Sequence, residues 1–527
     1  LPLALVIGLV AAACSSTATD TDTTTTVAPV APETVATTTT IPPDPDRPIT
    51  TAGPVTGAAD DEVRRFLAIP YAAPPVGERR FAPPQPPEPW TDDFAATTPG
   101  AACPQVADLT ASFTTLPEES SEDCLTLDVV APLDADGLPV MVWIHGGGLT
   151  SGSAHQPLFE GTNLAEQGVV VVNINYRLGA LGFLVTDGLS VEGGPTGNWG
   201  LQDQRLALEW VQDNIAGFGG DPGNVTIFGE SAGGFSVCAL LAVDGAPQTL
   251  FHRAIIQSGA GCGPFQPFAE ATGDGTAFVN ETTCAGAADG DAEAECLRAL
   301  GLDALLAVEQ PNSFVADGTL LTQSALELAE SGQLTPVPII TGFNQNEASL
   351  FNLGREEPSD AELRELFAEI APEADLDVLI ELYAIGFASN LDRFFALSTD
   401  LTFACPAMQF ADAASVVTSV WTYHLTYVSP LTPLDLGATH GAELVYLFGN
   451  PEGIPLLEAS EISGDDQRVA DFFQKEWVAF ARDGQPSSAW LSHRVDEPSV
   501  YEIGDRPLLR PVGRDGRCAA LVDAGAR

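Results

Sequence analysis

The stretch Asn224-Val-Thr-Ile-Phe-Gly-Glu-Ser-Ala-Gly-Gly234 decides the fold. Residues 225–228 form a short apolar run that is typical of a buried strand. The next five residues have the form G-x-S-x-G, a sharp strand-to-helix turn that lifts a serine hydroxyl clear of a sheet. Glycine is needed at both ends of this motif because larger side chains would collide with neighbouring backbone. The stretch therefore predicts a strand, a nucleophilic Ser231 and a helix, in that order.

Further short apolar runs alternate with helical patterns on both sides of this turn. Continuous apolar runs of this length suit a parallel sheet that is covered on both faces. The expected strands are residues 140–144, 169–174, 225–228, 254–257, 337–341 and 420–427, and the clearest helical patterns are 201–215 and 467–482. The alternation predicts an α/β fold with a central, mostly parallel sheet flanked by helices. The more helical stretch 270–330 is expected to form an insertion over the active site.

A glycine run, Trp143-Ile-His-Gly-Gly-Gly148, ends an expected strand well before Ser231. Acyl transfer creates an alkoxide, which needs preorganised N–H donors. Glycines allow backbone N–H groups to turn inward without shielding by side chains. We expect the N–H groups of Gly147, Gly148 and Ala232 to form this oxyanion hole. A phosphate-binding loop is the rival interpretation, and the chain lacks the G-K-[ST] and G-x-G-x-x-G patterns that it would need.

A nucleophilic serine needs a base, which is usually histidine, and the chain has six histidines. In sheets that carry this turn, the chain order is nucleophile, acid, base. That order excludes His145 and His155 and makes His145 a structural residue. His252 follows Ser231 too closely to leave room for an acid on a later strand.

Three histidines remain after this exclusion. His424 lies inside an expected strand, where a core histidine is the better interpretation, and His493 lies in a polar C-terminal segment. His440 lies in a loop after a strand, where a base belongs. The acid should follow an earlier strand, and Glu347 follows the strand at 337–341. It would hold the tautomer of His440 and stabilise the imidazolium. An acid in a loop is often only solvated, so these residues alone leave the pair open.

The first 50 residues differ in composition from the rest. Residues 1–14 form an apolar stretch that ends in Ala-Ala-Ala-Cys14 and is too short to span a bilayer. It resembles a bacterial lipoprotein signal, in which the cysteine becomes the lipidated first residue; an ordinary cleaved signal is the alternative. Residues 15–50 are rich in Thr, Pro and Ala, which favours a disordered spacer. We expect residues 51–527 to form one domain of an exported protein, either a cell-surface lipoprotein or secreted.

Charge and cysteine content restrict the possible partners. The net charge of −51 argues against binding to nucleic acid or anionic membranes, and leaves an N-terminal lipid as the only expected membrane contact. The nine cysteines include no C-x-x-C pair, which argues against a four-cysteine zinc site. We expect neither a metal nor a cofactor.

Taken together, these stretches resemble the type-B carboxylesterase family, which includes cholinesterases and bacterial carboxylesterases. The resemblance covers the chain from about Gly53 to Cys518. It is carried by residues 66–77 (FLAIPYAAPPVG), 121–125 (SEDCL), 198–234 with GLQDQR and FGESAG, 342–347 (GFNQNE) and His440-Gly441. It implies the α/β-hydrolase fold and a triad of Ser231, Glu347 and His440.

The resemblance also implies residues around the triad. Ser258 corresponds to a position near the acid of the family, and Glu230 is expected to tune the base. Three disulfides and two free thiols are implied, namely the pairs Cys103–Cys124, Cys284–Cys296 and Cys405–Cys518, with Cys238 and Cys262 free. Each disulfide would stabilise the fold by roughly 2–4 kcal/mol.

The sequence thus predicts a serine hydrolase that cleaves small-molecule carboxylic esters to acid and alcohol through an acyl-enzyme intermediate. Lipase, amidase and thioesterase activities are close alternatives. A non-catalytic, cholinesterase-like adhesion protein is a more distant one, because such proteins commonly lack the nucleophile. Cholinesterases keep a Trp between their first two disulfide cysteines, whereas residues 103–124 contain Phe113 and no Trp. Choline esters are therefore not the expected substrates.

Overall fold

A computed structural model describes residues 44–106, 115–190, 197–430, 436–454, 464–505, 508–511 and 516–526. Cys14, the signal-like stretch, most of the expected spacer and Phe113 lie outside these ranges. Pro43–Arg527 form one compact unit. Residues 44–50, which composition assigned to the spacer, belong to this unit, since Arg47 pairs with Asp93 at 2.6 Å and Thr50 is buried. Composition could not reveal these contacts because their partners lie further along the chain.

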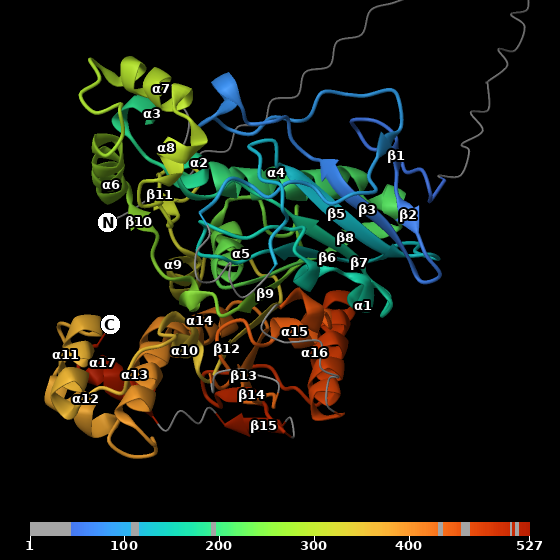
Figure 1. Ribbon diagram of the computed structural model, residues 1–527. Helices are drawn as coiled ribbons and strands as arrows, with labels where there is room; N and C mark the ends of the chain where they lie inside the picture. Colours follow the sequence, from blue (N-terminus) through green and yellow to red (C-terminus); the bar gives the residue numbers. More distant parts are fainter. Residues whose placement is uncertain are drawn as a thin grey trace, which may run out of the picture. The chain divides into compact units, whose positions relative to one another are not determined.

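The core of the fold is an 11-stranded sheet with the strand order β15-β14-β13-β12-β9-β8-β6-β7-β5-β3-β2 (Figure 1). The strands from β7 to β14 in this order are parallel, and antiparallel strands complete both edges. Their bounds are β2 Ala58–Ala59, β3 Val63–Pro70, β5 Thr126–Pro132, β6 Leu138–Ile144, β7 Val170–Ile174, β8 Gly220–Glu230, β9 Arg253–Gln257, β12 Ile339–Asn344, β13 Val420–Leu425, β14 Ser499–Ile503 and β15 Leu508–Pro511. Two short pairs lie outside the sheet, β1 Val55–Thr56 with β4 Phe94–Ala95, and β10 Gln266–Pro267 with β11 Val315–Ala316.

The sheet separates two apolar cores, as the alternation along β6 shows. Val140, Val142 and Ile144 belong to one core, while Met141 and Trp143 belong to the other. Successive side chains of a strand point to opposite faces, so a strand covered on both sides is apolar throughout. This explains why the central strands appear in the sequence as unbroken apolar runs. The six strands expected from the sequence correspond to β6, β7, β8, β9, β12 and β13.

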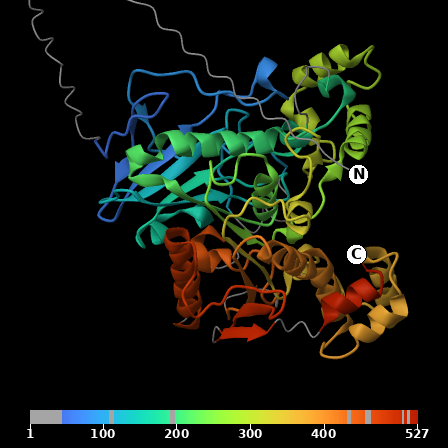
Figure 2. The ribbon, with the colours of Figure 1, turned by 180° about the vertical axis from the view of Figure 1, so that it is seen from behind.

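Helices cover both faces of the sheet. The first core includes side chains of α4 and α5, and the second includes side chains of α15 and α16, on the opposite side of the sheet in Figures 1 and 2. The helix bounds are α1 Thr162–Ala165, α2 Gly179–Phe183, α3 Asp187–Ser190, α4 Trp199–Asn214, α5 Ala232–Ala242, α6 Phe268–Asn280, α7 Gly290–Ala299, α8 Leu302–Leu306, α9 Ala325–Glu330, α10 Glu347–Phe351, α11 Asp360–Ile370, α12 Leu376–Leu382, α13 Asn390–Thr399, α14 Cys405–Ser415, α15 Leu444–Phe448, α16 Gly464–Asp483 and α17 Arg517–Asp523. In the described ranges, no helix combines the length and apolarity needed to cross a bilayer.

Two helical groups are inserted between the strands. Helices α6, α7 and α8 gather in one group after β9, within the stretch 270–330 that the sequence marks as an insertion. Helices α11, α12 and α13 form a second group with α17 from the C-terminus, around their own small apolar core (Figures 1 and 2). The chain thus combines a regular α/β sheet with two helical additions.

Candidate active site

Ser231 lies at the turn between β8 and α5 and has φ 57° and ψ −124°. A positive φ is rare for a residue with a side chain, and its cost is sustained only where the surroundings fix the backbone. Here the N–H of Ser231 donates to the carbonyl of Gln257 at 2.9 Å, and the carbonyl of Ser231 accepts from Phe235 in the first turn of α5. The turn places the serine at the positive end of the α5 helix.

The two motif glycines are required by close backbone contacts. A Cβ atom at Gly233 would lie 2.0 Å from the carbonyl oxygen of Ile144, and one at Gly229 would lie 2.4 Å from the carbonyl carbon of Gly233. Helix α5 therefore begins directly against the end of β6. No other residue allows this approach, which agrees with the prediction from the motif.

The glycine run after β6 forms a tight turn beside the serine. Gly147 and Gly148 have φ 105° and 61°, and the carbonyl of Gly147 accepts from the N–H of Ser151 at 2.9 Å. Within the described part of the chain, no hydrogen bond uses the N–H groups of Gly147, Gly148 or Ala232. These three groups, expected as oxyanion donors, are therefore available to a ligand. Their catalytic role stays a prediction.

His145 is held at the base of this turn. Its ring stacks on Tyr176 with centroids 4.5 Å apart, and its Nδ1 lies 2.8 Å from the carbonyl oxygen of Gly146. Burial lowers the pKa of His145 to about 4. A buried, stacked imidazole of this kind fits the structural role that the sequence predicted for His145.

The structure brings His440 and Glu347 together. Nδ1 of His440 lies 2.6 Å from Oε2 of Glu347, and both side chains are buried. Glu347 is the first residue of α10, just beyond the end of β12, and His440 lies in the loop after β13. Carboxyl ends of neighbouring parallel strands meet at one edge of a sheet, which brings the two loops together.

The other carboxylate oxygen of Glu347 is also fixed. Oε1 accepts from the hydroxyl of Ser258 at 2.7 Å and from the N–H of Asn344 at 2.6 Å. The side chain of Asn344 in turn donates to Glu443 Oε2 at 2.6 Å. The position expected for Ser258, near the acid, agrees with this geometry. Sequence reasoning missed Asn344 and Glu443, although Glu443 follows His440 by only three residues.

Glu230 approaches His440 from the side opposite Glu347. Its Oε1 lies 3.0 Å from His440 Nε2, but neither atom has a hydrogen-bond partner among the described residues. Burial raises the pKa of Glu230, against the attraction of His440. Burial lowers the pKa of His440, but the negative charges of Glu230 and Glu347 outweigh it and raise this pKa. The Nε2 atom therefore lies beside a carboxyl oxygen without a hydrogen bond to a described residue.

Aromatic rings flank the imidazole. The rings of Phe351 and Phe403 have their centroids 4.9 and 5.0 Å from that of His440. Phe351 ends α10, and Phe403 precedes α14. These residues give no signal in the sequence, because no motif connects them to the histidine.

Other histidines contact residues outside the proposed triad. His155 contacts Asp128 at 2.8 Å, and the ring of His424 in β13 is tilted against that of Phe343, with the centroids 4.8 Å apart. His493, which the sequence placed in a polar segment, is buried and contacts Asp412 at 2.7 Å. In the described ranges, no group of three or more His, Cys, Asp or Glu side chains could hold a metal ion.

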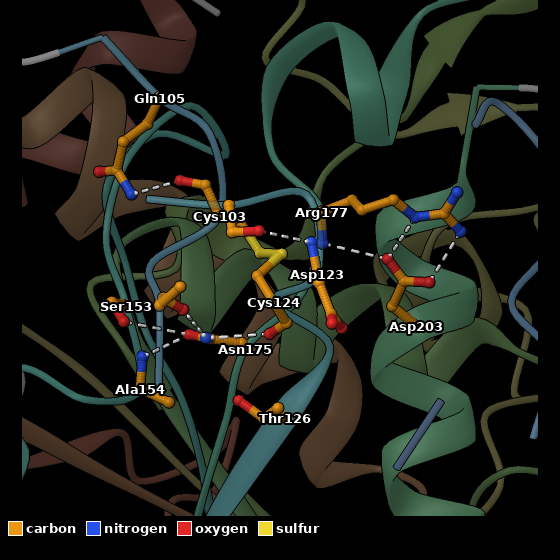
Figure 3. Close-up of a disulfide and its surroundings, with 12 residues drawn as sticks. Cys103, Gln105, Asp123, Cys124, Thr126, Ser153, Ala154, Asn175, Arg177 and Asp203 are labelled. Atoms are coloured by element: carbon orange, nitrogen blue, oxygen red, sulfur yellow. Dashed lines mark hydrogen bonds and ion pairs between the residues drawn. A yellow bond between two sulfur atoms is a disulfide. The ribbon is translucent and has the colours of Figure 1, made fainter. Parts of the chain in front are cut away.

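The three expected disulfides are present. They join Cys103–Cys124, Cys284–Cys296 and Cys405–Cys518. Figure 3 shows the first of them beside two further ties: Asn175, which accepts from Ala154 N at 2.7 Å, and the buried pair Arg177–Asp203 at 2.8 Å.

The expectation that Cys238 and Cys262 are free thiols is wrong. They form a fourth disulfide, with Cα atoms 5.0 Å apart. The family resemblance implied only three pairs, and the two cysteines meet only because the chain after β9 turns back onto α5. Cys14, the ninth cysteine, lies outside the described residues.

Comparison with known proteins agrees with this geometry. The model of the carboxylesterase family matches residues 45–519. The chain belongs to the carboxylesterase family. It is 38% identical to the para-nitrobenzyl esterase of Bacillus subtilis (strain 168), over 87% of this chain and 94% of that one. It is 37% identical to a human cocaine esterase, over 82% of each chain.

Solved structures lead to the same family. A PNB esterase structure superposes with a TM-score of 0.79 and 32% identity, covering 91% of this chain and 99% of that one. A second, described as a thermophilic PNB esterase, gives the same score and identity. The fold is therefore that of an α/β hydrolase, and this carboxylesterase-family member is a carboxylic ester hydrolase.

Proposed function

We propose that Ser231, His440 and Glu347 carry out ester hydrolysis as nucleophile, base and acid. His440 Nε2 removes the hydroxyl proton of Ser231 as the oxygen attacks the ester carbonyl. The N–H groups of Gly147, Gly148 and Ala232 bind the resulting alkoxide. The tetrahedral intermediate collapses, His440 donates its proton to the leaving alcohol, and Ser231 keeps the acyl group. Water then attacks the acyl-enzyme with His440 as base, which releases the acid and restores the serine.

The observation that carries these roles is the hydrogen bonding of the two ring nitrogens of His440. Glu347 occupies its Nδ1 atom at 2.6 Å, which fixes the tautomer with a lone pair on Nε2, and Nε2 has no hydrogen-bond partner among the described residues. A histidine held this way is ready to accept a proton on one nitrogen only. Ser231 supports the proposal through its positive φ at the start of α5, the conformation by which this kind of turn presents a serine hydroxyl.

Glu230 is proposed to act through His440 and not on the substrate. Its buried carboxyl lies 3.0 Å from Nε2 and changes the proton affinity of the base. Ser258 is proposed to hold Glu347 in place through its 2.7 Å hydrogen bond.

The first experiment compares wild-type enzyme with Ser231→Ala on p-nitrophenyl acetate and butyrate. We expect kcat to fall by about 10⁴-fold or more in the variant, because removal of a triad member leaves only binding and oxyanion stabilisation. Ser359→Ala is the matched control, since Ser359 is the exposed N-cap of α11 and its side chain bonds only to Glu362 among the described residues. It should keep wild-type kcat. Wild-type turnover that survives in Ser231→Ala would overturn the assignment, and an inactive but folded wild type would revive a binding-protein function.

The proposed substrates are small soluble esters. Its relatives include a para-nitrobenzyl esterase and cocaine esterases, and this supports small-molecule esters as substrates. A lipase would instead act faster on emulsified long-chain esters than on dissolved short-chain ones. A panel of both kinds of ester separates the two activities.

Export to an oxidising compartment is also proposed. Four disulfides are rarely kept in a reducing cytosol. The apolar stretch that ends at Cys14 suits a leader, and lipid on Cys14 would anchor the enzyme at a cell surface. Mass spectrometry of the natural protein, beside a Cys14→Ser variant, would show whether this cysteine carries lipid.

A further inference from the structure

The Cys238–Cys262 disulfide joins the two backbone segments that hold opposite ends of the proposed triad. We propose that it is a positioning element of the active site, which keeps Ser258 against Glu347, and not only a stabiliser of the fold. This inference rests on the triad roles proposed above.

One end of the disulfide lies on the nucleophile helix. Cys238 follows Ser231 in α5 by about two helical turns, and its side chain is buried. The other end, Cys262, closes the short 3-10 helix η4 (Ala260–Cys262) and is also buried. The bond thus ties the helix of the nucleophile directly to the segment that starts at Ser258.

That segment has an unusual backbone. Ser258, Ala260 and Cys262 have φ of 50°, 50° and 57°, and Gly261 has φ 73°. Three non-glycine residues within five positions therefore have their backbone in the left-handed region, and this concentrates strain in the segment. Such conformations persist only where the surroundings fix them. The segment therefore needs an external tie, and the disulfide supplies it at the strained Cys262.

The packing around the segment limits where it could relax. A Cβ atom at Gly259 would lie 2.8 Å from the carbonyl carbon of Gly234 in α5, and one at Gly261 would lie 2.3 Å from Pro406 in α14. The segment is wedged between these two helices. Without the covalent bond, relief of strain would move the backbone away from one helix and carry Ser258 with it.

Ser258 connects this backbone to the chemistry. Its hydroxyl donates to Glu347 Oε1 at 2.7 Å, and Glu347 Oε2 accepts from the imidazole of His440 at 2.6 Å. A shift of Ser258 would release one oxygen of the acid and loosen the orientation of the base. This would slow the chemical steps but would leave the binding of substrate largely unchanged.

The test is a double-mutant cycle between the disulfide and Ser258. We expect Cys238→Ala/Cys262→Ala and Ser258→Ala each to lower kcat by about tenfold with little change in KM. Their combination should lower kcat by about tenfold in all, no more than either change alone, since both act through one hydrogen bond. Cys284→Ala/Cys296→Ala is the matched control, because it removes a disulfide that joins the α6–α7 connection to α7, away from Ser258 in the chain. It should lower Tm and leave kcat unchanged.

Several results would overturn the inference. A folded disulfide variant with wild-type kcat would do so, and so would a combined loss of about a hundredfold, which would mean independent effects. If the disulfide variant does not fold, Ser258→Ala with wild-type kcat would still refute the proposed route. These outcomes differ from failure of the triad itself, which would appear as activity that survives in Ser231→Ala.

Discussion

At the scale of single residues, the site is an imidazole surrounded by buried acids. Glu230, Glu347 and Glu443 all contribute negative charge at His440, and all three are buried. Glu347 is hydrogen-bonded through both oxygens, and Glu443 accepts from Asn344 and Gln257. Glu230 differs, because its Oε1 lacks a hydrogen bond among the described residues. It is therefore the acid whose charge depends most directly on the proton of His440.

Glu230→Gln is expected to move the acidic limb of the kcat/KM profile to lower pH. The limb reports protonation of His440, which must be neutral to act as a base. The negative charge of Glu230 raises the pKa of His440, so its removal lowers that pKa and keeps the base neutral at lower pH. The measurement is kcat/KM for p-nitrophenyl butyrate between about pH 5 and 10, because the pKa of His440 is raised to about 9 in the wild type.

The matched control for this profile is Glu209→Gln, which removes a carboxylate from an exposed pair on α4. It should leave the acidic limb in place. An unchanged or raised midpoint in Glu230→Gln would show that Glu230 does not act on the base.

At the scale of elements, the nucleophile turn depends on helix α5 starting against β6. The turn combines an apolar strand, a strained serine and two glycines, and each part is visible in the sequence. The contact itself is made between Gly233 and the carbonyl of Ile144, residues that lie far apart in the chain. The geometry of the serine therefore depends on the position of a neighbouring strand.

Gly233→Ala is expected to destabilise the fold and to abolish activity. The added Cβ would lie 2.0 Å from the backbone oxygen of Ile144, and neither partner is a flexible side chain. Overpacking of this kind costs about 1–3 kcal/mol or more, and displacement of α5 would also move Ser231. Urea unfolding and p-nitrophenyl butyrate turnover measure the two effects.

Gly273→Ala is the matched control, because it makes the same substitution where the added methyl group has room. Gly273 lies within α6, and a Cβ there would meet open space. Alanine should raise the free energy of unfolding by about 0.5–1 kcal/mol and leave kcat unchanged. A fully active, stable Gly233→Ala would refute the requirement for close approach.

At the scale of the whole molecule, the dominant property is charge. The chain carries 72 acidic and 21 basic residues, for a net charge of −51. Repulsion among the excess carboxylates destabilises the compact state, while the net charge keeps the protein soluble. Ion pairs can offset little of this repulsion, because acidic residues outnumber basic residues by more than three to one.

The Tm is expected to rise when NaCl is raised from about 10 mM to about 300 mM. Over this range the Debye length falls from about 30 Å to under 10 Å, so repulsion between distant carboxylates is screened. Differential scanning calorimetry measures the effect, with equimolar changes of an uncharged solute such as sucrose as the control. A Tm that is flat or falls with salt would mean that the surface charge does not limit stability.

The central sheet and the strained turn at Ser231 could be predicted from the sequence alone. The central strands are buried on both faces, so their apolar runs are unbroken, and the G-x-S-x-G turn places Ser231 at the end of one of them. These are local signals, since each depends on residues that are neighbours in the chain. The antiparallel strands β3 and β5, which lie between β7 and the edge strand β2, were not expected from the sequence.

The arrangement of the acids and of the fourth disulfide depends on the tertiary structure and could not be predicted from the sequence. Glu230 reaches His440 from the end of β8, and Asn344 joins Glu347 to Glu443 from the end of β12. Cys238 meets Cys262 where a strained turn folds back onto α5. Pairing of this kind depends on which strand ends meet at one edge of the sheet. The distances between these side chains are set by the packing of the whole sheet. No short stretch of sequence determines them.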